Sequence, residues 1–257
     1  MEIGYALAGL LVGFIVGLTG VGGGSLMTPL LIMGFGIPPA TAVGTDLLYA
    51  SLTKATGVWA HARRGNVDWK LVGRMAVGSL PAAVVALLVL HLIGVDSRPV
   101  GGLITAALGV ALILTALAIL FKDRLQQLGS RPGRESWRAR HVAGVTVAVG
   151  AVIGALVALS SVGAGAVGVA ALFWIYPAIS SRRIVGSDIA HAVPLTAVAG
   201  LGHSFMGTVE WPLLLNLLIG SLPGIWIGSH VSGRISERWL RPALAAMLVI
   251  VGGKLVW

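Results

Sequence analysis

Cysteine is absent from this chain of 257 residues, and charged residues are scarce. Without cysteine there can be no disulfide, no thiolate metal ligand and no thiol step in catalysis or transport. Charged residues make up 11% of the chain, whereas soluble domains carry about 25%. Hydrophobic residues make up 56%, and the mean hydropathy is +0.94. The composition therefore excludes an ordinary soluble domain and predicts an integral membrane protein.

Acidic residues are scarcer than basic residues: the chain has 9 Asp and Glu but 18 Lys and Arg. A net charge of +9 would suggest nucleic-acid binding in a soluble chain, but here the basic residues lie in short segments between apolar runs. Cytoplasmic loops of membrane proteins have this excess of Lys and Arg. We therefore expect the lipid bilayer, and no nucleic acid, as a partner. No basic region precedes the first apolar segment, so we expect that segment to be retained and not cleaved as a signal peptide.

The longest apolar run, residues 3–35, is too long for one membrane helix. At about 1.5 Å per residue it would reach roughly 50 Å, whereas the hydrocarbon core is about 30 Å thick. A glycine-rich segment, residues 20–25, breaks this run near its middle, and residues 160–166 break a second run, residues 142–176, in the same way. Each run is therefore predicted to form a broken hairpin of two half-helices.

Three further apolar segments follow each broken run. In the first half, residues 1–121, they predict helices over 40–60, 71–93 and 100–121. In the second half, residues 142–257, they predict helices over 184–202, 212–232 and 242–257. The basic segment 122–141 is predicted to link the halves. The predicted fold class is an all-α polytopic membrane protein.

The two halves are related in sequence as well as in plan. Residues 43–81 match residues 185–223 at fourteen of thirty-nine positions without a gap, at a constant offset of 142. The matches include Asp46 with Asp188, which apolar bias alone does not produce. The glycine-rich segments align at an offset of 141. We interpret this as an internal duplication.

The distribution of charge decides between two counts of membrane crossings. If each broken run crossed once, basic segments would fall on both faces of the membrane. If each run enters, turns and leaves on one side, fifteen of the 18 Lys and Arg lie on one face and two on the other, with Lys54 inside a helix. The positive-inside rule favours the second count. Three crossings per half then predict inverted repeats, a cytoplasmic linker and both termini outside.

The two broken segments are the candidate binding site. Where each return helix begins, near Gly24 and Gly165, free N–H groups and the helix dipole favour an anion. Inverted repeats with interrupted helices place a substrate near the midplane, between the halves. Close helix packing is the alternative explanation and the preferred one for a single glycine cluster, whereas two clusters at matched positions favour a binding site. We expect two facing tips to form one small oxyanion site from Thr19, Gly22, Gly23, Gly24, Ser25, Ser160, Ser161, Gly163 and Gly165.

Four polar residues lie inside predicted helices, where burying charge is costly and function is the default hypothesis. Asp46 and Asp188 either take up a coupling proton or accept N–H bonds from a hairpin tip. Lys54 either balances the charge of a bound anion or extends to the interface, and His191 is a candidate pH-sensitive gate. The sequence contains no Ser-His-Asp set and no metal-ligand spacing, so it predicts no catalytic residue, no metal site, no cofactor and no enzyme.

Three motifs, together with the duplication, resemble the TauE/SafE sulfite exporter family. They are the glycine-rich segment 20–25, the helix start at residues 42–46 and the loop at residues 65–68. The resemblance covers nearly the whole chain. It implies a multi-pass permease of the bacterial inner membrane for sulfite, organosulfonates such as sulfoacetate, thiosulfate or sulfate. Thiosulfate-handling members use cysteines, so the absence of cysteine here argues against thiosulfate.

The leading hypothesis is a transporter of small sulfur-containing anions, secondary active, working by alternating access and coupled to protons. We expect a monomer or a homodimer. The alternatives are a sulfate or thiosulfate uptake permease, a membrane scaffold or assembly protein, and a membrane enzyme. A scaffold would explain the packing glycines but not the intramembrane Asp and Lys.

Overall fold

The computed structural model describes residues 2–19, 24–94, 98–130, 135–231 and 237–256, and every regular element in these ranges is a helix. The helices are α1 (Glu2–Thr19), α2 (Gly24–Phe35), α3 (Pro39–Arg63), α4 (Trp69–Ile93), α5 (Arg98–Gly129), α6 (Glu135–Ser160), α7 (Ala166–Ile175), α8 (Ser181–Phe205), α9 (Trp211–Val231) and α10 (Glu237–Val256). The all-α prediction is confirmed.

The largest difference from the predicted bounds lies in the basic segment 122–141. Here α5 continues to Gly129, and α6 already begins at Glu135. Residues 122–128 are mostly Lys, Arg, Gln and Leu, which propagate a helix at little cost once the apolar part has formed. Most of this hydrophilic segment therefore belongs to α5 and α6.

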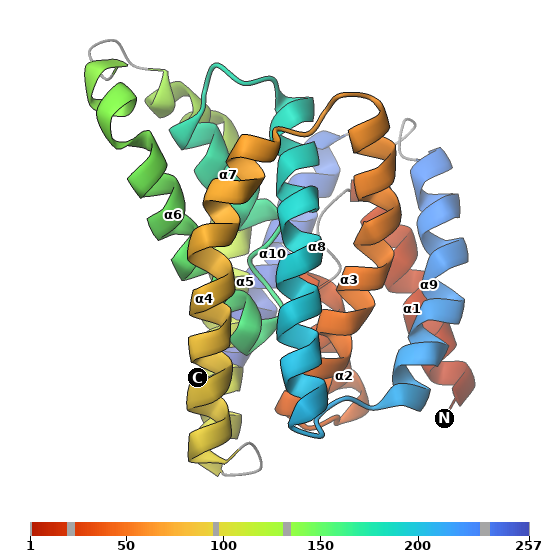
Figure 1. Ribbon diagram of the computed structural model, residues 1–257. Coiled ribbons are helices and arrows are strands. Elements are labelled where there is room, and N and C mark those ends of the chain that lie inside the picture. Colours follow the sequence, from red (N-terminus) through yellow and green to blue (C-terminus); the bar gives the residue numbers. More distant parts are fainter. Residues whose placement is uncertain (1, 20–23, 95–97, 131–134, 232–236, 257) are drawn as a thin grey trace.

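The two broken runs fold back on themselves (Figure 1). The helices α1 and α2 both have their free ends at the lower end of the molecule as drawn, whereas α6 and α7 open toward the upper end. Likewise α3 runs upward and α8 downward beside it, and the two helices are in contact. Both termini lie toward the lower end, away from the α5–α6 connection.

The same contacts occur twice between matched elements. α1 packs on α9 as α6 packs on α4, while α3 pairs with α8 and α5 with α10. A Cβ atom at Gly78 of α4 would overlap the carbonyl oxygen of Val147, and one at Gly220 of α9 would overlap that of Ala6. Glycines at these positions let the helix backbones approach closely, as small residues do in membranes.

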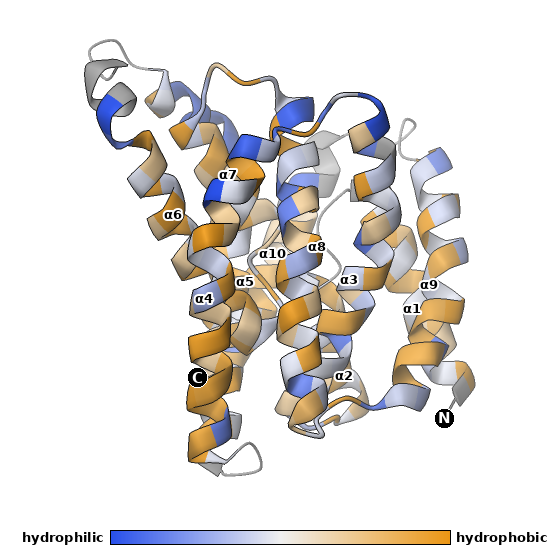
Figure 2. Ribbon diagram, viewed as in Figure 1, coloured by the Kyte–Doolittle hydropathy of each residue, from blue (hydrophilic) through white to orange (hydrophobic). Residues whose placement is uncertain are grey.

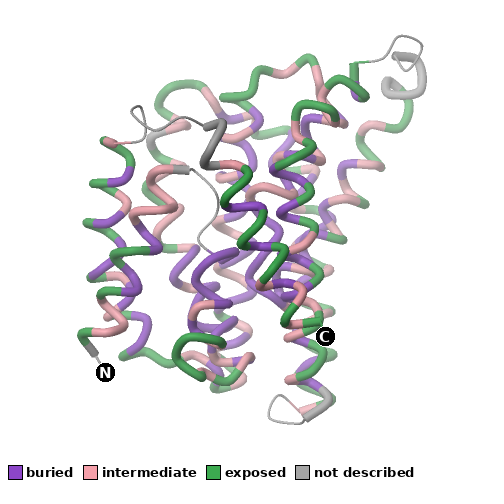
Figure 3. The backbone as a smooth tube through the Cα atoms, turned by 180° about the vertical axis from the view of Figure 1, so that it is seen from behind, coloured by how far each residue is buried: buried purple, intermediate pink, exposed green. Residues whose placement is uncertain are grey.

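The outer surface of this bundle is apolar. Phe205 is 91% exposed and Leu92 is 82% exposed, and the hydrophilic residues gather at the upper end (Figure 2). The buried residues lie on the faces turned toward neighbouring helices (Figure 3). Among the described residues, five helices are long and apolar enough to span a membrane: α4, α5, α6, α8 and α9. α3 is as long as α4, but polar residues lower its hydropathy.

Candidate functional site

The second hairpin tip, residues 160–165, is an irregular turn between α6 and α7. Ser161, Gly163 and Gly165 have φ angles of 58°, 127° and 139°, a region that glycine enters without steric cost. The Ser160 hydroxyl donates to the Leu156 carbonyl at 2.6 Å and accepts from Val162 N–H at 3.2 Å. Ser160, predicted as a binding residue, thus hydrogen-bonds within its own tip.

The two tips meet in the interior. Gly24, at the start of α2, lies against the backbone of Ser161, whose carbonyl oxygen a Cβ at Gly24 would overlap. A cavity of about 10 Å³, room for one water molecule, lies between them. Its lining consists of Gly24, Ser25, Thr115, Ser161, Val162, Gly163, Ala164 and Ala166. Four of the predicted binding residues, Gly24, Ser25, Ser161 and Gly163, are therefore neighbours across two hairpins.

Other predicted binding residues are placed differently. Gly165 precedes α7, and its carbonyl accepts a backbone hydrogen bond from Val169 N–H at 2.8 Å. Thr19 is the last residue of α1. Gly22 and Gly23 lie outside the described residues.

Asp46 connects α3 to the return helix of the first hairpin. Its carboxyl group is fully buried, and the Thr28 hydroxyl donates to Oδ2 at 2.5 Å. The Ser161 side chain faces the same carboxyl group from the second tip. Within the described residues neither Asp46 Oδ1 nor Ser161 Oγ has a hydrogen-bond partner. Asp46 is thus bonded to α2, the return helix of the first hairpin, and faces the tip of the second hairpin.

Asp188 occupies the matched position on α8 but has different neighbours. It is 1% exposed, and its Oδ1 lies directly over Gly168 of α7, where a Cβ would overlap it. This oxygen has no hydrogen-bond partner in the part of the chain that the structure describes. Asp188 therefore lies beside the second hairpin without being bonded to it through Oδ1.

Lys54 reaches the second tip from α3. Its ammonium group donates to the Ala164 carbonyl at 3.0 Å, and it interacts electrostatically with Asp188 and, less strongly, with Asp46. The matched residue of the other half, Thr196, bonds only to its own helix, at the Ala192 carbonyl. The cluster of tips and carboxyl groups therefore has one ammonium group, supplied by the first half.

His191 and its mate Tyr49 make matched contacts. His191 Nε2 lies 2.7 Å from the Ser79 hydroxyl of α4, and Tyr49 contacts the Ser221 side chain of α9. Both rings are buried. These pairs join the central helices α3 and α8 to their outer neighbours, and the sequence gives no sign of the pairing.

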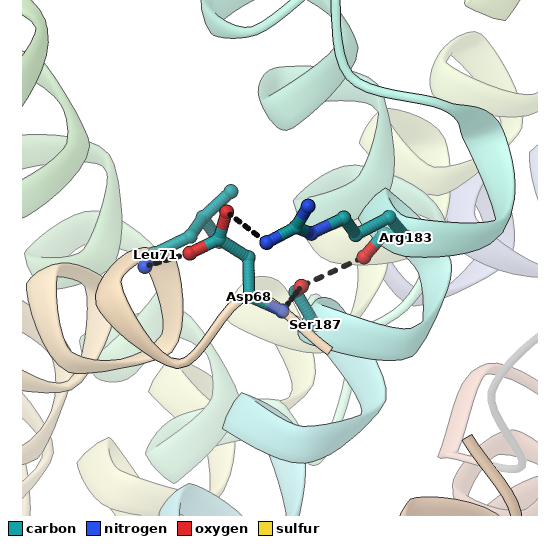
Figure 4. Close-up of polar contacts among 4 residues, drawn as sticks. All are labelled: Asp68, Leu71, Arg183 and Ser187. Atoms are coloured by element: carbon teal, nitrogen blue, oxygen red, sulfur yellow. Dashed lines mark hydrogen bonds and ion pairs between the residues drawn. The ribbon is translucent and has the colours of Figure 1, made fainter. Parts of the chain in front are cut away.

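Two further junctions, one near each end of the α3–α8 pair, were not predicted. At one junction Asp68 N–H donates to the Ser187 hydroxyl at 2.8 Å, and at the other Glu210 N–H donates to the Thr45 hydroxyl at 3.1 Å. Of these two junctions, only the first has an ion pair among the described residues: Arg183 lies 3.3 Å from Asp68 Oδ2, while Asp68 Oδ1 caps α4 at Leu71 N–H (Figure 4).

The Asp68 junction supports a prediction on stability. Asp68→Asn keeps an N-cap oxygen and loses the ion pair to Arg183, whose side chain is 50% exposed, so we expect a loss of less than about 1 kcal/mol. Asp68→Ala also removes the N-cap and should cost about 1 kcal/mol more. Thermal unfolding of the detergent-solubilised protein measures both. Equal losses would show that the cap contributes nothing.

The similarity to known proteins extends over the whole chain. The sequence profile described as "Sulfite exporter TauE/SafE" matches residues 5–255. The chain belongs to the TauE/SafE family. A Bacillus subtilis relative of this TauE/SafE protein, "Probable membrane transporter protein YjnA", is 42% identical over 100% of both chains. "Probable membrane transporter protein MJ0441" of Methanocaldococcus jannaschii is 26% identical over 95% of this chain and 92% of its own. No solved structure matches.

Two residues that lie at the site of the TauE/SafE protein were not predicted from the sequence. Thr115 of α5 lines the cavity between the tips, although its hydroxyl bonds to the Ala111 carbonyl of its own helix. Thr28 holds Asp46. The signal for Thr28 is present in the sequence, because it is a hydroxyl residue one turn into a return helix predicted to start near Gly24. Among the described residues, no group of three His, Asp or Glu side chains could hold a metal.

Proposed function

We propose that this membrane transporter carries small sulfur-containing anions, such as sulfite or an organosulfonate, across the bacterial inner membrane by secondary active transport. The observation that carries the proposal is the meeting of two hairpin tips around Gly24 and Ser161, deep in the bundle and beside buried charged groups. Two short helices start at this point, and helix N-termini favour anions.

The repeated contacts support inverted repeats as the basis of alternating access. Each tip belongs to a different half, and each half packs its first helix on the fourth helix of the other. Rocking one half against the other would separate the tips toward one face at a time. The cytoplasmic side would be the end that bears the α5–α6 connection and the hydrophilic residues in Figure 2, with both termini outside.

The small volume at the tips supports an occluded state. A cavity of about 10 Å³ holds one water molecule, and a sulfonate group is larger than that. The junctions at Asp68 and Glu210 are both formed in the same structure. An anion could therefore bind only after the tips separate, when one of these junctions opens.

Flux in proteoliposomes tests the function. We expect saturable uptake of at least one anion among sulfite, sulfoacetate, sulfate and thiosulfate, with taurine as a zwitterion for comparison, each measured with and without a pH gradient. Liposomes without protein are the control. Transport of thiosulfate or sulfate alone would favour the uptake permease. If none of these solutes is carried, the proposal fails and a scaffold role becomes the better explanation.

A further inference from the structure

The charges around the tips do not balance. Lys54 brings one ammonium group, and it acts on two buried carboxyl groups, Asp188 more strongly than Asp46. If all three were ionised, the cluster would carry a net negative charge beside a site for an anion. Such repulsion is strong where water is excluded. An anion can therefore enter easily only if one carboxyl group is neutral.

The two carboxyl groups are held in different ways. Asp46 accepts a hydrogen bond from Thr28 and faces Ser161. Asp188 lies over Gly168, which offers no side chain, and its Oδ1 has no partner in the described residues. Both Oδ1 atoms lack a hydrogen-bond partner in the described residues. An ionised Asp46 is the stronger acceptor for Thr28, so protonating Asp46 would weaken the bond that anchors α2, whereas protonating Asp188 at Oδ1 disturbs no such bond.

The surroundings of Asp188 contain few titratable groups. α8 packs on α3, α4, α6 and α7. Lys54 of α3 is the charged group that acts on Asp188, and α7 presents Gly168. On α8 itself, His191 lies one turn further along and is hydrogen-bonded to Ser79 of α4. Arg74 of α4 bonds to Tyr176.

Lys54 is hydrogen-bonded to one of the residues that line the cavity between the tips. Its ammonium group binds the carbonyl of Ala164, and Ala164 lines that cavity together with Gly24 and Ser161. An anion seated between the tips would therefore lie near the ammonium group, which also interacts electrostatically with Asp188. The anion and the Asp188 carboxylate would compete for one positive charge.

We infer that Lys54 couples anion binding to the protonation of Asp188, so that the anion and one proton cross together in the same direction. When the anion draws the ammonium group, Asp188 loses its counter-charge and takes a proton from the aqueous phase to which the site is open. By linkage, a protonated Asp188 releases Lys54 to the anion. The inference rests on the proposed function and adds to it the identity and direction of the coupling.

Paired measurement of anion and proton uptake tests the coupling. Radiolabelled sulfate and sulfoacetate are suitable probes, because both stay fully ionised between about pH 6 and 8 and bring no proton of their own, since carboxyl groups titrate near pH 4. Proteoliposomes contain a pH-sensitive dye. We expect the wild-type protein to acidify the lumen as the probe enters, and an inward proton gradient to raise accumulation about tenfold.

Four variants assign the roles. Asp188→Asn should still exchange labelled for unlabelled probe but lose the gradient-driven accumulation, about tenfold. Lys54→Gln should weaken probe binding about tenfold and abolish the proton uptake, and Lys54→Arg should restore both. Asp46→Asn keeps an amide oxygen that can accept from Thr28, so it should keep both the flux and the ratio of protons to probe. Asp123→Asn, a carboxyl group 73% exposed at the end of α5, is the surface control.

The outcomes separate this inference from the function. If the wild-type protein carries the probe without protons, or if Asp188→Asn keeps both the gradient response and the proton uptake, the coupling through Asp188 is wrong while the transport function stands. If the wild-type protein carries neither probe nor any other anion of the series, both fail. Size-exclusion chromatography and thermal unfolding show that each variant is folded, so that a lost response is not a lost protein.

Discussion

Gly24→Leu should abolish anion flux, with some loss of stability, because its Cβ would overlap the backbone carbonyl oxygen of Ser161. A side chain at Gly24 points at the backbone of Ser161, in the contact that brings the two hairpin tips together. The cavity beside this contact has room for about one water molecule, so a leucine side chain would fill the proposed anion site. Flux in proteoliposomes, normalised to the inserted protein, measures the loss.

Two variants control for a general effect of substitution. Gly144→Leu on α6 adds the same side chain where a Cβ meets nothing within 4 Å, and it should retain flux. Ser161→Gly removes a hydroxyl group at a φ of 58°, which glycine adopts without strain, and should weaken anion binding without unfolding the tip. Wild-type flux in a folded Gly24→Leu protein would exclude the tips as the binding site.

Much of the fold could be predicted because the bilayer limits the length of the helices that can cross it. The overlong apolar runs with central glycines predicted the hairpins, and the structure breaks α1 from α2 and α6 from α7 at these places. The offset of 142 predicted which elements correspond. The prediction that the tips face each other used only the repeat and the depth of the breaks. In the part of the chain that the structure describes, Gly24 lies against Ser161.

The contacts between particular side chains could not be predicted. Helical periodicity shows which residues share a face, but not which helix that face meets or at what height. Lys54 therefore gave no sign that it would reach Ala164 or lie near Asp188. Once one contact is known, the repeat predicts the matched contact in the other half: the contact of His191 with Ser79 implies that of Tyr49 with Ser221.

The two halves differ at residues that lie near the hairpin tips. Lys54 of the first half is matched by Thr196 of the second. Thr28 of the first hairpin is matched by Val169 of the second hairpin. A duplicated pair of identical sites would bind two ligands. Here the single ammonium group and the single anchored carboxyl group favour one site that uses both halves.

Gly78→Leu should be the most destabilising of the packing changes in α4. A Cβ at this position would overlap the Val147 carbonyl of α6 and approach Ala151 N at 2.8 Å, so both contacts are with backbone that cannot rotate away. α4 and α6 must separate, which loses the close packing along their length. We expect a loss of about 3 kcal/mol or more, above the usual range for overpacking, measured by thermal unfolding in detergent.

The matched control lies on the same helix. Gly73→Leu places the same side chain on α4 at an open position, so its effect on unfolding should be small, and any difference between the two variants comes from the contact with α6. Gly220→Leu should reproduce the Gly78→Leu loss, because its Cβ would overlap the Ala6 carbonyl in the repeated α1–α9 contact. A stable Gly78→Leu with an unstable Gly220→Leu would show that only one of the two contacts holds the halves together. Rocking would then pivot on the α1–α9 contact alone, and the two interfaces would not be equivalent.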